Sequence, residues 1–396
     1  MVFKKQKISN DINLFFVFLV FGLFLRIWVT QFGSNFDFAM WEGNLELFKK
    51  DISIYEFGNY AYSTPWIYIL FLLDSISLPL IENTNFVQNT PGEFYRIKIV
   101  LFLCIIDILI FYLLYKNYSL KIGLLFFLNP IIIIITGHHN QFSQFAILFG
   151  FLSVLLYEDK ELKYRLFISA ALLGVSIAIK HILIFFPIWW AFKEKKLINK
   201  ILIISIPYTI FVLSFLPFLI NDLTFIIDKL CCFGKRTDGP FWGMFGSKII
   251  HMYLDLQTLY SLILLGLGII FVEKKLRESF YFYLMALVIF SSMMYTQYLA
   301  IPVIAIAVYW NWKYLIYTTL TFAVFLVDGD QLKIEYLRET FDWNLRATRI
   351  SFYPIILILL ICFLEEVFGK KKFYKFFINI YNFILKKINL SLKFKL

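Results

Sequence analysis

Long apolar blocks alternate with short polar segments along almost the whole chain. The clearest blocks cover residues 13–30, 97–115, 201–220, 259–272, 279–290 and 350–364. Their lengths are near or at the roughly 20 residues that an α-helix needs to cross the hydrocarbon core of a bilayer. This pattern predicts an all-α integral membrane protein with many spanning helices.

The Lys and Arg residues between these blocks predict which side of the membrane each segment faces. They gather in the N-terminus, Lys116–Lys121, Glu158–Arg165, Lys193–Lys200, Glu273–Glu278 and the tail from Lys370. Because basic residues near helix ends mark the cytoplasmic side, we place all of these segments inside. This arrangement requires an even number of spans and puts both termini in the cytoplasm.

A path of about 10 to 12 transmembrane helices satisfies both patterns. We expect helices near residues 12–30, 97–115, 122–136, 142–157, 166–180, 182–192, 200–220, 249–272, 279–294, 299–312, 314–327 and 350–367. Residues 1–369 then form one multispanning membrane domain. Residues 370–396 form a basic amphipathic tail, which we expect on the inner surface beside anionic lipid.

The first outer loop, residues 31–96, is unusually long. Its segment Tyr62–Leu80 is apolar, but a span there would invert every later loop and put the Lys-rich segments outside. We therefore expect interfacial helices in this loop. The last outer loop, Asp328 to Arg349, mixes both charges and is expected to form a folded cap.

The composition agrees with a membrane protein. Hydrophobic residues make up 60% of the 396 residues and charged residues 16%, whereas a soluble domain is about half apolar and about a quarter charged. The net charge of +11 raises the question of a nucleic-acid partner. The basic residues lie at helix ends, where they set orientation, so no nucleic-acid partner is predicted.

Unusual polar residues gather on the outer side of this path. The clusters are Asp37 with Glu42, Gly137–Gln141, Lys180 with His181, Lys235 with Arg236, and Tyr295–Tyr298. An ionisable residue at membrane depth is costly and therefore predicts function. Convergence on one leaflet is typical of an active site, whereas a pore needs polar residues along its whole depth.

Each cluster also has a purely structural interpretation. Asp37 can be an ordinary loop carboxylate, and Lys180 can extend its amine to the outer interface. His138 and His139 can simply end a helix. Because adjacent helical residues point in different directions, this pair does not predict a shared metal site. The two basic residues of the fourth cluster can be plain loop charges.

Three aromatic residues lie near the first cluster, namely Trp41, Tyr62 and Trp66. Their rings could stack on sugar faces. Trp and Tyr are also the usual anchors at a membrane interface, and we favour the anchor interpretation.

The order of several motifs resembles a known family of membrane enzymes. In chain order they are Asp37 after the first helix, Tyr62–Pro65, Asn129-Pro130, Gly137–Gln141, Lys180 before Pro187, and Gln297-Tyr298 before Pro302. Over roughly residues 12–310 this order resembles the C-type (GT-C) glycosyltransferases, which use sugars linked to a lipid phosphate. The chain is most similar to the mannosyl- and glucosyltransferases of lipid-linked oligosaccharide and glycosylphosphatidylinositol assembly, and to their bacterial relatives.

Two positions depart from the pattern of the family. Members often carry Pro-Pro where this chain has Thr64-Pro65, but one Pro is enough to start a helix. Members often carry Asp or Asn after the Gln, where this chain has Phe142-Ser143. Which residue of this outer turn touches substrate therefore stays open.

The resemblance implies that Asp37 is the catalytic base of an inverting transfer. A sugar on a lipid phosphate has a leaving group that departs as a stable anion. One carboxylate is therefore enough, unlike the acid–base pair of hydrolases. Asp37 would take the proton of the acceptor hydroxyl as this attacks the anomeric carbon. Glu42 is the second candidate for the base, although its position one turn further along suits acceptor binding better.

The other polar residues are assigned to binding. Cationic groups should hold the departing phosphate, and the candidates are Lys180, His181, Lys235 and Arg236. Arg is the better bidentate partner for phosphate. The candidates for binding acceptor or substrate are Glu42, His138, His139, Gln141, Gln297 and Tyr298.

The expected reaction moves one hexose from a polyprenyl-phosphate donor to a glycan, glycolipid or protein acceptor. Mannose is the default sugar by resemblance alone. The site is expected on the extracytoplasmic side of the cell membrane, or on the lumenal side of the endoplasmic reticulum membrane. No cofactor is expected, and no dense carboxylate cluster implies a divalent metal.

Two other classes of function stay open. A polysaccharide polymerase or ligase would rely on basic residues of the late loops, such as Arg338, Arg346 and Arg349, and would tolerate the loss of Asp37. A transporter or flippase for lipid-linked sugars would need charged or broken helices near the midplane. Asp107 and Pro130 are modest indications of that kind, and Asp107 is expected to face the bundle interior.

Overall fold

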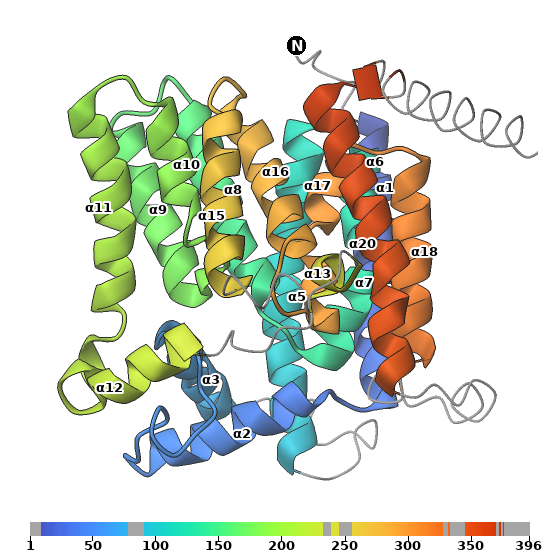
Figure 1. Ribbon diagram of the computed structural model, residues 1–396. Helices are drawn as coiled ribbons and strands as arrows, with labels where there is room; N and C mark the ends of the chain where they lie inside the picture. Colours follow the sequence, from blue (N-terminus) through green and yellow to red (C-terminus); the bar gives the residue numbers. More distant parts are fainter. Residues whose placement is uncertain are drawn as a thin grey trace, which may run out of the picture.

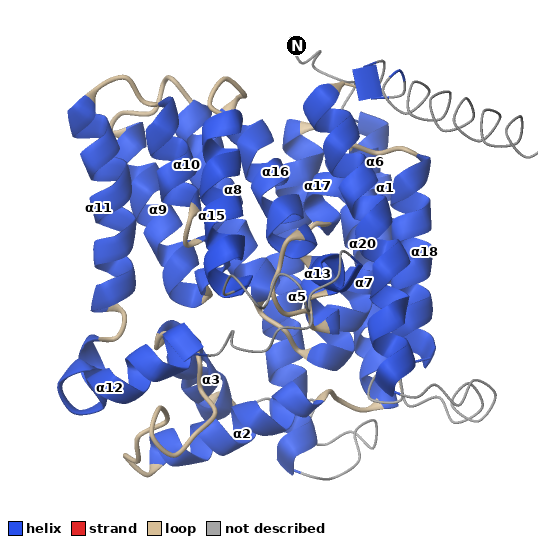
Figure 2. Cartoon of the chain, in the orientation of Figure 1, coloured by secondary structure: helices blue, strands red, loops and turns tan. Residues whose placement is uncertain are grey.

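The computed structural model describes residues 9–77, 91–232, 239–244, 256–327, 332, 345–369, 372, 373 and 375. Helices and loops make up all of these residues, with no strand among them (Figure 2). The α-helices are α1 (Ser9–Val29), α2 (Phe36–Lys49), α3 (Pro65–Ser75), α5 (Pro91–Asn117), α6 (Leu120–Phe127), α7 (Pro130–Ile134), α8 (Ser143–Glu158), α9 (Arg165–Ile179), α10 (Phe186–Lys193), α11 (Leu197–Leu213), α12 (Leu216–Cys232), α13 (Pro240–Met244), α15 (Leu256–Ile270), α16 (Leu276–Ile289), α17 (Val303–Val308), α18 (Trp312–Val327) and α20 (Leu345–Phe368). Short 3-10 or π segments are η1 (Thr30–Phe32), η2 (Ile135–His139), η3 (His181–Leu183) and η4 (Thr296–Ala300).

Several helices have the length and composition of membrane spans. Among the described residues, Asn13–Phe32 and Tyr95–Asn117 can each cross a membrane, and two bent helix pairs raise the number of candidate spans to four. Shorter apolar helices of 10–17 residues accompany them. The all-helical class is thus confirmed, and the spans indicate a membrane protein. The path of about 10 to 12 spans and the side that each loop faces stay predictions.

Two of the helices predicted as continuous are broken in the structure. The predicted helix 122–136 is divided at Asn129, with an angle of 46° between its two parts. The Asn129 side chain accepts a hydrogen bond from Ile131 N at 2.9 Å and caps α7, which starts at Pro130. The predicted helix 200–220 bends by 90° between α11 and α12. The first break follows from the Asn129 cap. At the second, Ser214 and Pro217 lie at the bend, and Pro cannot continue the hydrogen bonds of the preceding helix.

The helices form a bundle with a crosswise layer at one end. Helices α8, α9, α10 and α11 run side by side, whereas α2 and α12 lie across the ends of these helices (Figure 1). The crosswise helices come from the predicted outer loop and from the bend after α11. Most of the predicted tail 370–396, and most of the predicted cap 328–349, lie outside the described residues.

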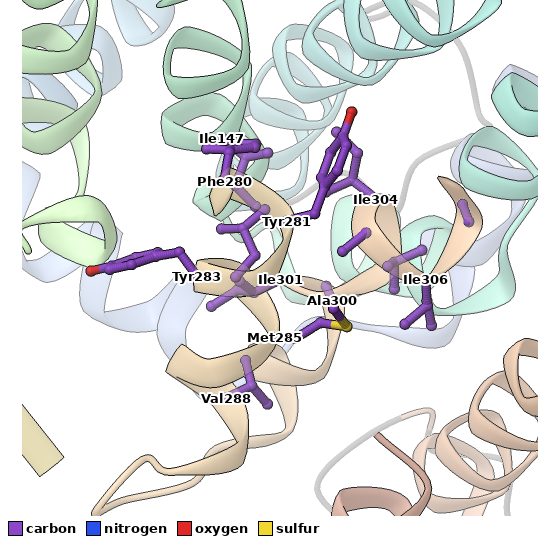
Figure 3. Close-up of a cluster of buried hydrophobic side chains, with 14 of the residues drawn as sticks. Ile147, Phe280, Tyr281, Tyr283, Met285, Val288, Ala300, Ile301, Ile304 and Ile306 are labelled. Carbon is purple, nitrogen blue, oxygen red and sulfur yellow. The ribbon is translucent and has the colours of Figure 1, made fainter. Parts of the chain in front are cut away.

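The main hydrophobic core lies between helices of the bundle. Side chains of α8, α16 and α17 meet there, and Figure 3 shows Ile147, Phe280, Met285 and Ile304 among them. A second core joins the crosswise layer to the bundle and includes Trp41, Trp66, Phe142 and Ile226. This second core holds α2, the helix that carries Asp37, against the ends of α8 and α9.

Candidate active site

Asp37 lies in the first turn of α2, where the helix dipole favours a carboxylate. The turn before it is attached to η2. Asn35 N donates to the His138 carbonyl at 3.3 Å, and the Asn35 amide nitrogen lies 2.9 Å from His139 Nδ1. These contacts join the start of α2 to a segment about 100 residues later in the chain. Asp37 itself is half-buried.

Gln141 connects Asp37 with Lys180. Its Nε2 donates to Asp37 Oδ2, and its Oε1 accepts a hydrogen bond from Lys180 Nζ at 3.2 Å. Lys180 Nζ also donates to Ser143 Oγ at 2.9 Å. A single amide therefore bridges an acidic and a basic side chain, and all of its polar atoms face the site.

Gln297, from the short helix η4, binds the same carboxylate oxygen. Its Nε2 donates to Asp37 Oδ2 at 3.2 Å, and the residue lies in η4, just before Pro302. Two amides thus share Oδ2, and this pairing fixes the orientation of the carboxylate. The four residues Asp37, Gln141, Lys180 and Gln297, which we name the Asp37 cluster, come from four distant parts of the chain.

The electrostatics of the Asp37 cluster are dominated by burial. Burial raises the pKa of the Asp37 carboxyl above its ordinary value, and the nearby Lys180 charge opposes this rise. Burial likewise lowers the pKa of Lys180, opposed by Asp37. In both groups burial disfavours the charged form, which is the carboxylate of Asp37 and the ammonium of Lys180. The pair therefore consists of a carboxylate with increased proton affinity and an ammonium that is poorly solvated.

Aromatic rings surround the Lys180 amine. Lys180 Nζ lies 4.9 Å from the centre of the Phe142 ring and 5.4 Å from that of Tyr62, within the range of cation–π attraction. Two more rings pack behind them. Trp66 stacks on Phe142 at 4.2 Å, and Trp41 meets the same ring edge-on at 5.5 Å.

The interpretation of Trp41 and Trp66 as interface anchors is wrong. Both side chains are buried, with at most 1% exposed, inside the second core. Neither ring is open to lipid or to a sugar face. Tyr62 is half-buried beside Lys180 and is the one of the three aromatic residues that keeps an exposed surface.

The backbone of the Gly137–Gln141 motif is shaped for this site. The π-helical turn η2 ends at Asn140, which has a positive φ of 57°, and the next residue turns its amide toward Asp37. Asn and Asp tolerate this left-handed conformation better than most residues. Gly137 is required by a close approach, because a Cβ there would lie 2.4 Å from the Arg26 carbonyl.

The Tyr62–Pro65 motif attaches α3 to the segment that carries Lys180. The Ser63 hydroxyl donates to the carbonyl of Ala178, two residues before Lys180. Pro65 is the first residue of α3. The motif thus positions Tyr62 next to the amine and starts the helix that packs behind it.

The other predicted site residues lie around the Asp37 cluster to different extents. His138 and His139 are fully buried in η2, and His139 contacts the Asp37 turn through Asn35. His181 is half-buried, with its ring 6.2 Å from that of Tyr62. Glu42 and Tyr298 are half-buried, in α2 and η4. Lys235 and Arg236 lie outside the described residues.

Two contributors were not singled out from the sequence. Ser143 binds the Lys180 amine, and Asn35 joins the Asp37 turn to His139. The signal for Ser143 was its position two residues after Gln141, in the same turn. Among the described residues, no group of three or more His, Cys, Asp and Glu side chains could hold a metal ion.

A second acidic–basic pair lies deeper in the bundle. Arg26 Nε donates to Asp107 Oδ2 at 2.9 Å, and both side chains are buried. Thr136 Oγ1 donates to the same oxygen at 2.7 Å. The two remaining guanidinium nitrogens donate to the carbonyls of Gly22 and Phe127, each at 2.9 Å. This pair fastens α1, α5 and η2 together.

Comparison of the chain with protein-family models, with curated proteins and with solved structures found no match.

Proposed function

We propose that this protein is an inverting glycosyltransferase. It moves one hexose, with mannose as the default, from a polyprenyl-phosphate carrier to an acceptor at the extracytoplasmic or lumenal face of a membrane. The observation that supports this most is the Asp37 cluster, where Gln141 bridges a half-buried carboxylate and a buried lysine. The two groups that the reaction needs, a base and a phosphate-binding cation, thus lie on either side of one amide.

Asp37 is the general base of this proposal. Gln141 and Gln297 both donate to Oδ2, so Oδ1 is the oxygen left to accept the proton of the acceptor hydroxyl. Burial increases the proton affinity of the carboxyl, as the pKa shift indicates, and this suits a base that works near neutral pH. In this scheme both glutamines orient the base and do not bind the substrate directly.

Lys180 binds the donor phosphate. As the acceptor oxygen forms its bond to the anomeric carbon, the bond from this carbon to the phosphate oxygen breaks. The electron pair stays on the phosphate. The Lys180 ammonium stabilises this developing charge, and the low polarity of its surroundings strengthens the attraction. The leaving phosphate needs no proton, so no acid is required beside the base.

The proposal places the Asp37 cluster on the outer side of a path with about 10 to 12 spans. The crosswise helices α2 and α12 then lie at the outer boundary of the bilayer, where a lipid-linked donor presents its head group. The basic segments between the other helix ends face the cytoplasm.

The alternative functions draw less support from the described residues. Asp107, the ionisable residue that a transporter could use at membrane depth, is paired with Arg26 and accepts a hydrogen bond from Thr136, both at Oδ2. For a polymerase or ligase, Arg338 lies outside the described residues, and the side chains of Arg346 and Arg349 are likewise not described.

The test is ligand-dependent thermal stabilisation of the purified protein in nanodiscs. A panel of synthetic polyprenyl-phosphate sugars is compared with polyprenyl phosphate alone, using wild type and Asp37→Asn. A ligand present at about 100 times its Kd stabilises the folded protein by about 2.7 kcal/mol. We expect one sugar-lipid to raise the thermal midpoint of both proteins, because a base variant binds its donor without turning it over.

A second outcome of the same titration would contradict the proposal. If no lipid monophosphate sugar shifts the midpoint and a diphosphate-linked oligosaccharide does, the transferase proposal is wrong. That result would favour a polymerase or a flippase as the function of the protein.

A further inference from the structure

The bend between α11 and α12 is built into the sequence. The Ser214 hydroxyl donates to the Phe211 carbonyl, and Pro217, the second residue of α12, has no N–H to continue the hydrogen bonds of α11. Thr64 Oγ1 donates to the Ser214 carbonyl from the start of α3. The apolar run that the sequence presents as one helix is therefore turned by 90° into the crosswise layer.

Helix α12 has one face that packs against the protein. Asp222 and Ile226 are buried, and Phe218 is half-buried among the aromatic residues of the second core. The Phe218 ring lies 5.4 Å from that of Tyr55 and 6.4 Å from that of Phe48. This face fixes α12 to the layer that carries α2 and α3.

A second face of α12 is apolar and covered by nothing in the described chain. Leu216, Ile220, Leu223 and Ile227 are all exposed, and Ile220 is 93% exposed. Their spacing of four, three and four residues places them on one stripe of the helix. We name these four residues the α12 stripe. The next face around the helix carries the exposed polar residues Asn221, Thr224 and Asp228.

The α12 stripe continues an apolar surface of α11. Val212 and Leu213 at the end of α11 are exposed, as are Ile201 and Leu197 nearer its start. Helix α11 is an apolar helix of 17 residues that runs beside α9 and α10 in the bundle (Figure 1). It passes as a candidate span only together with α12, after a bend of 90°. If α11 is the part of this pair that enters the bilayer, its exposed apolar residues face the acyl chains, and the stripe extends this surface past the bend.

We propose that α12 lies in the plane of the membrane surface, with the α12 stripe inserted among the lipids of one leaflet. An apolar stripe beside a polar face, on a helix at right angles to its neighbours, is typical of a helix that lies in a membrane interface. The polar face is turned to water, and the protein-facing side holds the crosswise layer.

The position of α12 matters for the candidate active site. The Thr64 hydroxyl binds the bend two residues after Tyr62, which lies over the Lys180 amine. Contact of the stripe with lipid therefore sets the depth of the Asp37 cluster relative to the leaflet surface.

The experiment uses the photoreactive residue p-benzoylphenylalanine at Ile220 or at Thr224. Each variant is reconstituted in phosphatidylcholine–phosphatidylglycerol nanodiscs, irradiated and analysed by mass spectrometry for lipid adducts. We expect several-fold more lipid adduct at position 220 than at position 224. Val20, which is 65% exposed on the candidate span of α1, is the positive control. The neighbouring pair Ile227 and Asp228 repeats the comparison if the first variants do not fold.

Three outcomes would overturn the proposal. Equal lipid adducts at 220 and 224 would mean that lipid surrounds the helix, as in a broken span. The absence of lipid adducts at 220, while Val20 gives them, would mean that the stripe is in water. Cross-linking of position 220 to a second copy of the chain would mean that the stripe is a protein interface.

Discussion

The Arg26–Asp107 pair and the Asp37–Lys180 pair combine the same kinds of group in different ways. Arg26 touches Asp107 directly, and each of its three guanidinium nitrogens donates a hydrogen bond inside the protein. Asp37 and Lys180 are instead joined through the amide of Gln141, and Asp37 stays half-buried. The Arg26–Asp107 pair is buried and in direct contact. The Asp37–Lys180 pair is separated by an amide, and its carboxylate is partly exposed.

The difference indicates two roles for buried charge in one molecule. Arg26 and Asp107 bring α1, α5 and η2 together, and their contacts leave the guanidinium no free nitrogen for a ligand. The Asp37 cluster keeps a carboxylate and an ammonium apart with their orientations fixed. A site that binds and transfers charge needs the second arrangement, because direct pairing would neutralise both groups.

The largest expected effect is on stability, at the enclosed pair. Asp107→Leu leaves the Arg26 guanidinium buried without its carboxylate, and losing one partner of a buried pair costs about 3–5 kcal/mol. We expect a lower thermal midpoint and a lower yield of folded protein. The double variant Arg26→Leu/Asp107→Leu should recover most of the loss. A single variant as stable as wild type would show that the pair does not hold the bundle together.

The next effect concerns ligand binding at the open pair. Lys180→Met should weaken the binding of polyprenyl phosphate by roughly 10- to 100-fold, because it removes a charge-assisted contact with the phosphate. Titration of the lipid against the thermal midpoint measures this change. Lys193→Met is the control, since the Lys193 amine binds the carbonyls of Val272 and Lys274 away from the Asp37 cluster. If Lys180→Met and Lys193→Met bind polyprenyl phosphate equally well, Lys180 does not bind the phosphate.

Gln141→Leu tests the bridge itself and should have a smaller effect. Losing the amide frees the Asp37 carboxylate from one of its two donors, so kcat should fall by about 10-fold while KM for the donor changes little. Asn117→Leu is the control, because the Asn117 amide donates to the Leu113 carbonyl at the end of α5, away from the Asp37 cluster. A change confined to KM would mean that Gln141 binds substrate and does not orient the base.

The smallest effect is a displacement of the pH profile. The transfer rate should rise with pH through the raised pKa of Asp37, because only the carboxylate can accept a proton. The rate should fall at higher pH through the lowered pKa of Lys180, because only the ammonium holds the phosphate. In Lys180→Met the rising limb should move to higher pH, since the charge that opposes protonation is gone. An unmoved rising limb would contradict the coupling of the two groups.

The sequence predicted the helical class and many helix positions, because apolar blocks near the length of a span are a strong signal. The predicted helices 142–157 and 166–180 agree with α8 and α9 to within a residue or two. The bend after Leu213 was not foreseen. The apolar run continues through it, and only Ser214 and Pro217 mark the place where the helix turns.

The members of the candidate site could be proposed from the sequence, but their connections could not. Four residues, Asp37, Gln141, Lys180 and Gln297, each stood out as polar in a turn that the sequence predicts on the outer side. That both glutamines would bind one carboxylate oxygen depends on the π-helical turn before Asn140 and on the short helix η4. The burial of Trp41 and Trp66 follows from the packing of α2 and α3 on Phe142, which no local pattern indicates.

The most direct test of the two roles compares Asp37→Asn with Asp107→Asn in one transfer assay. The donor is the polyprenyl-phosphate sugar selected by thermal stabilisation, and rates are normalised to the amount of folded protein. We expect Asp37→Asn to keep the wild-type midpoint and to lose roughly 10²- to 10⁴-fold in rate, the usual contribution of a general base. Asp107→Asn should lower the midpoint while its folded fraction keeps a rate near that of wild type. If Asp37→Asn transfers sugar as fast as wild type, or if Asp107→Asn is inactive when folded, the division between a chemical pair and a structural pair is wrong.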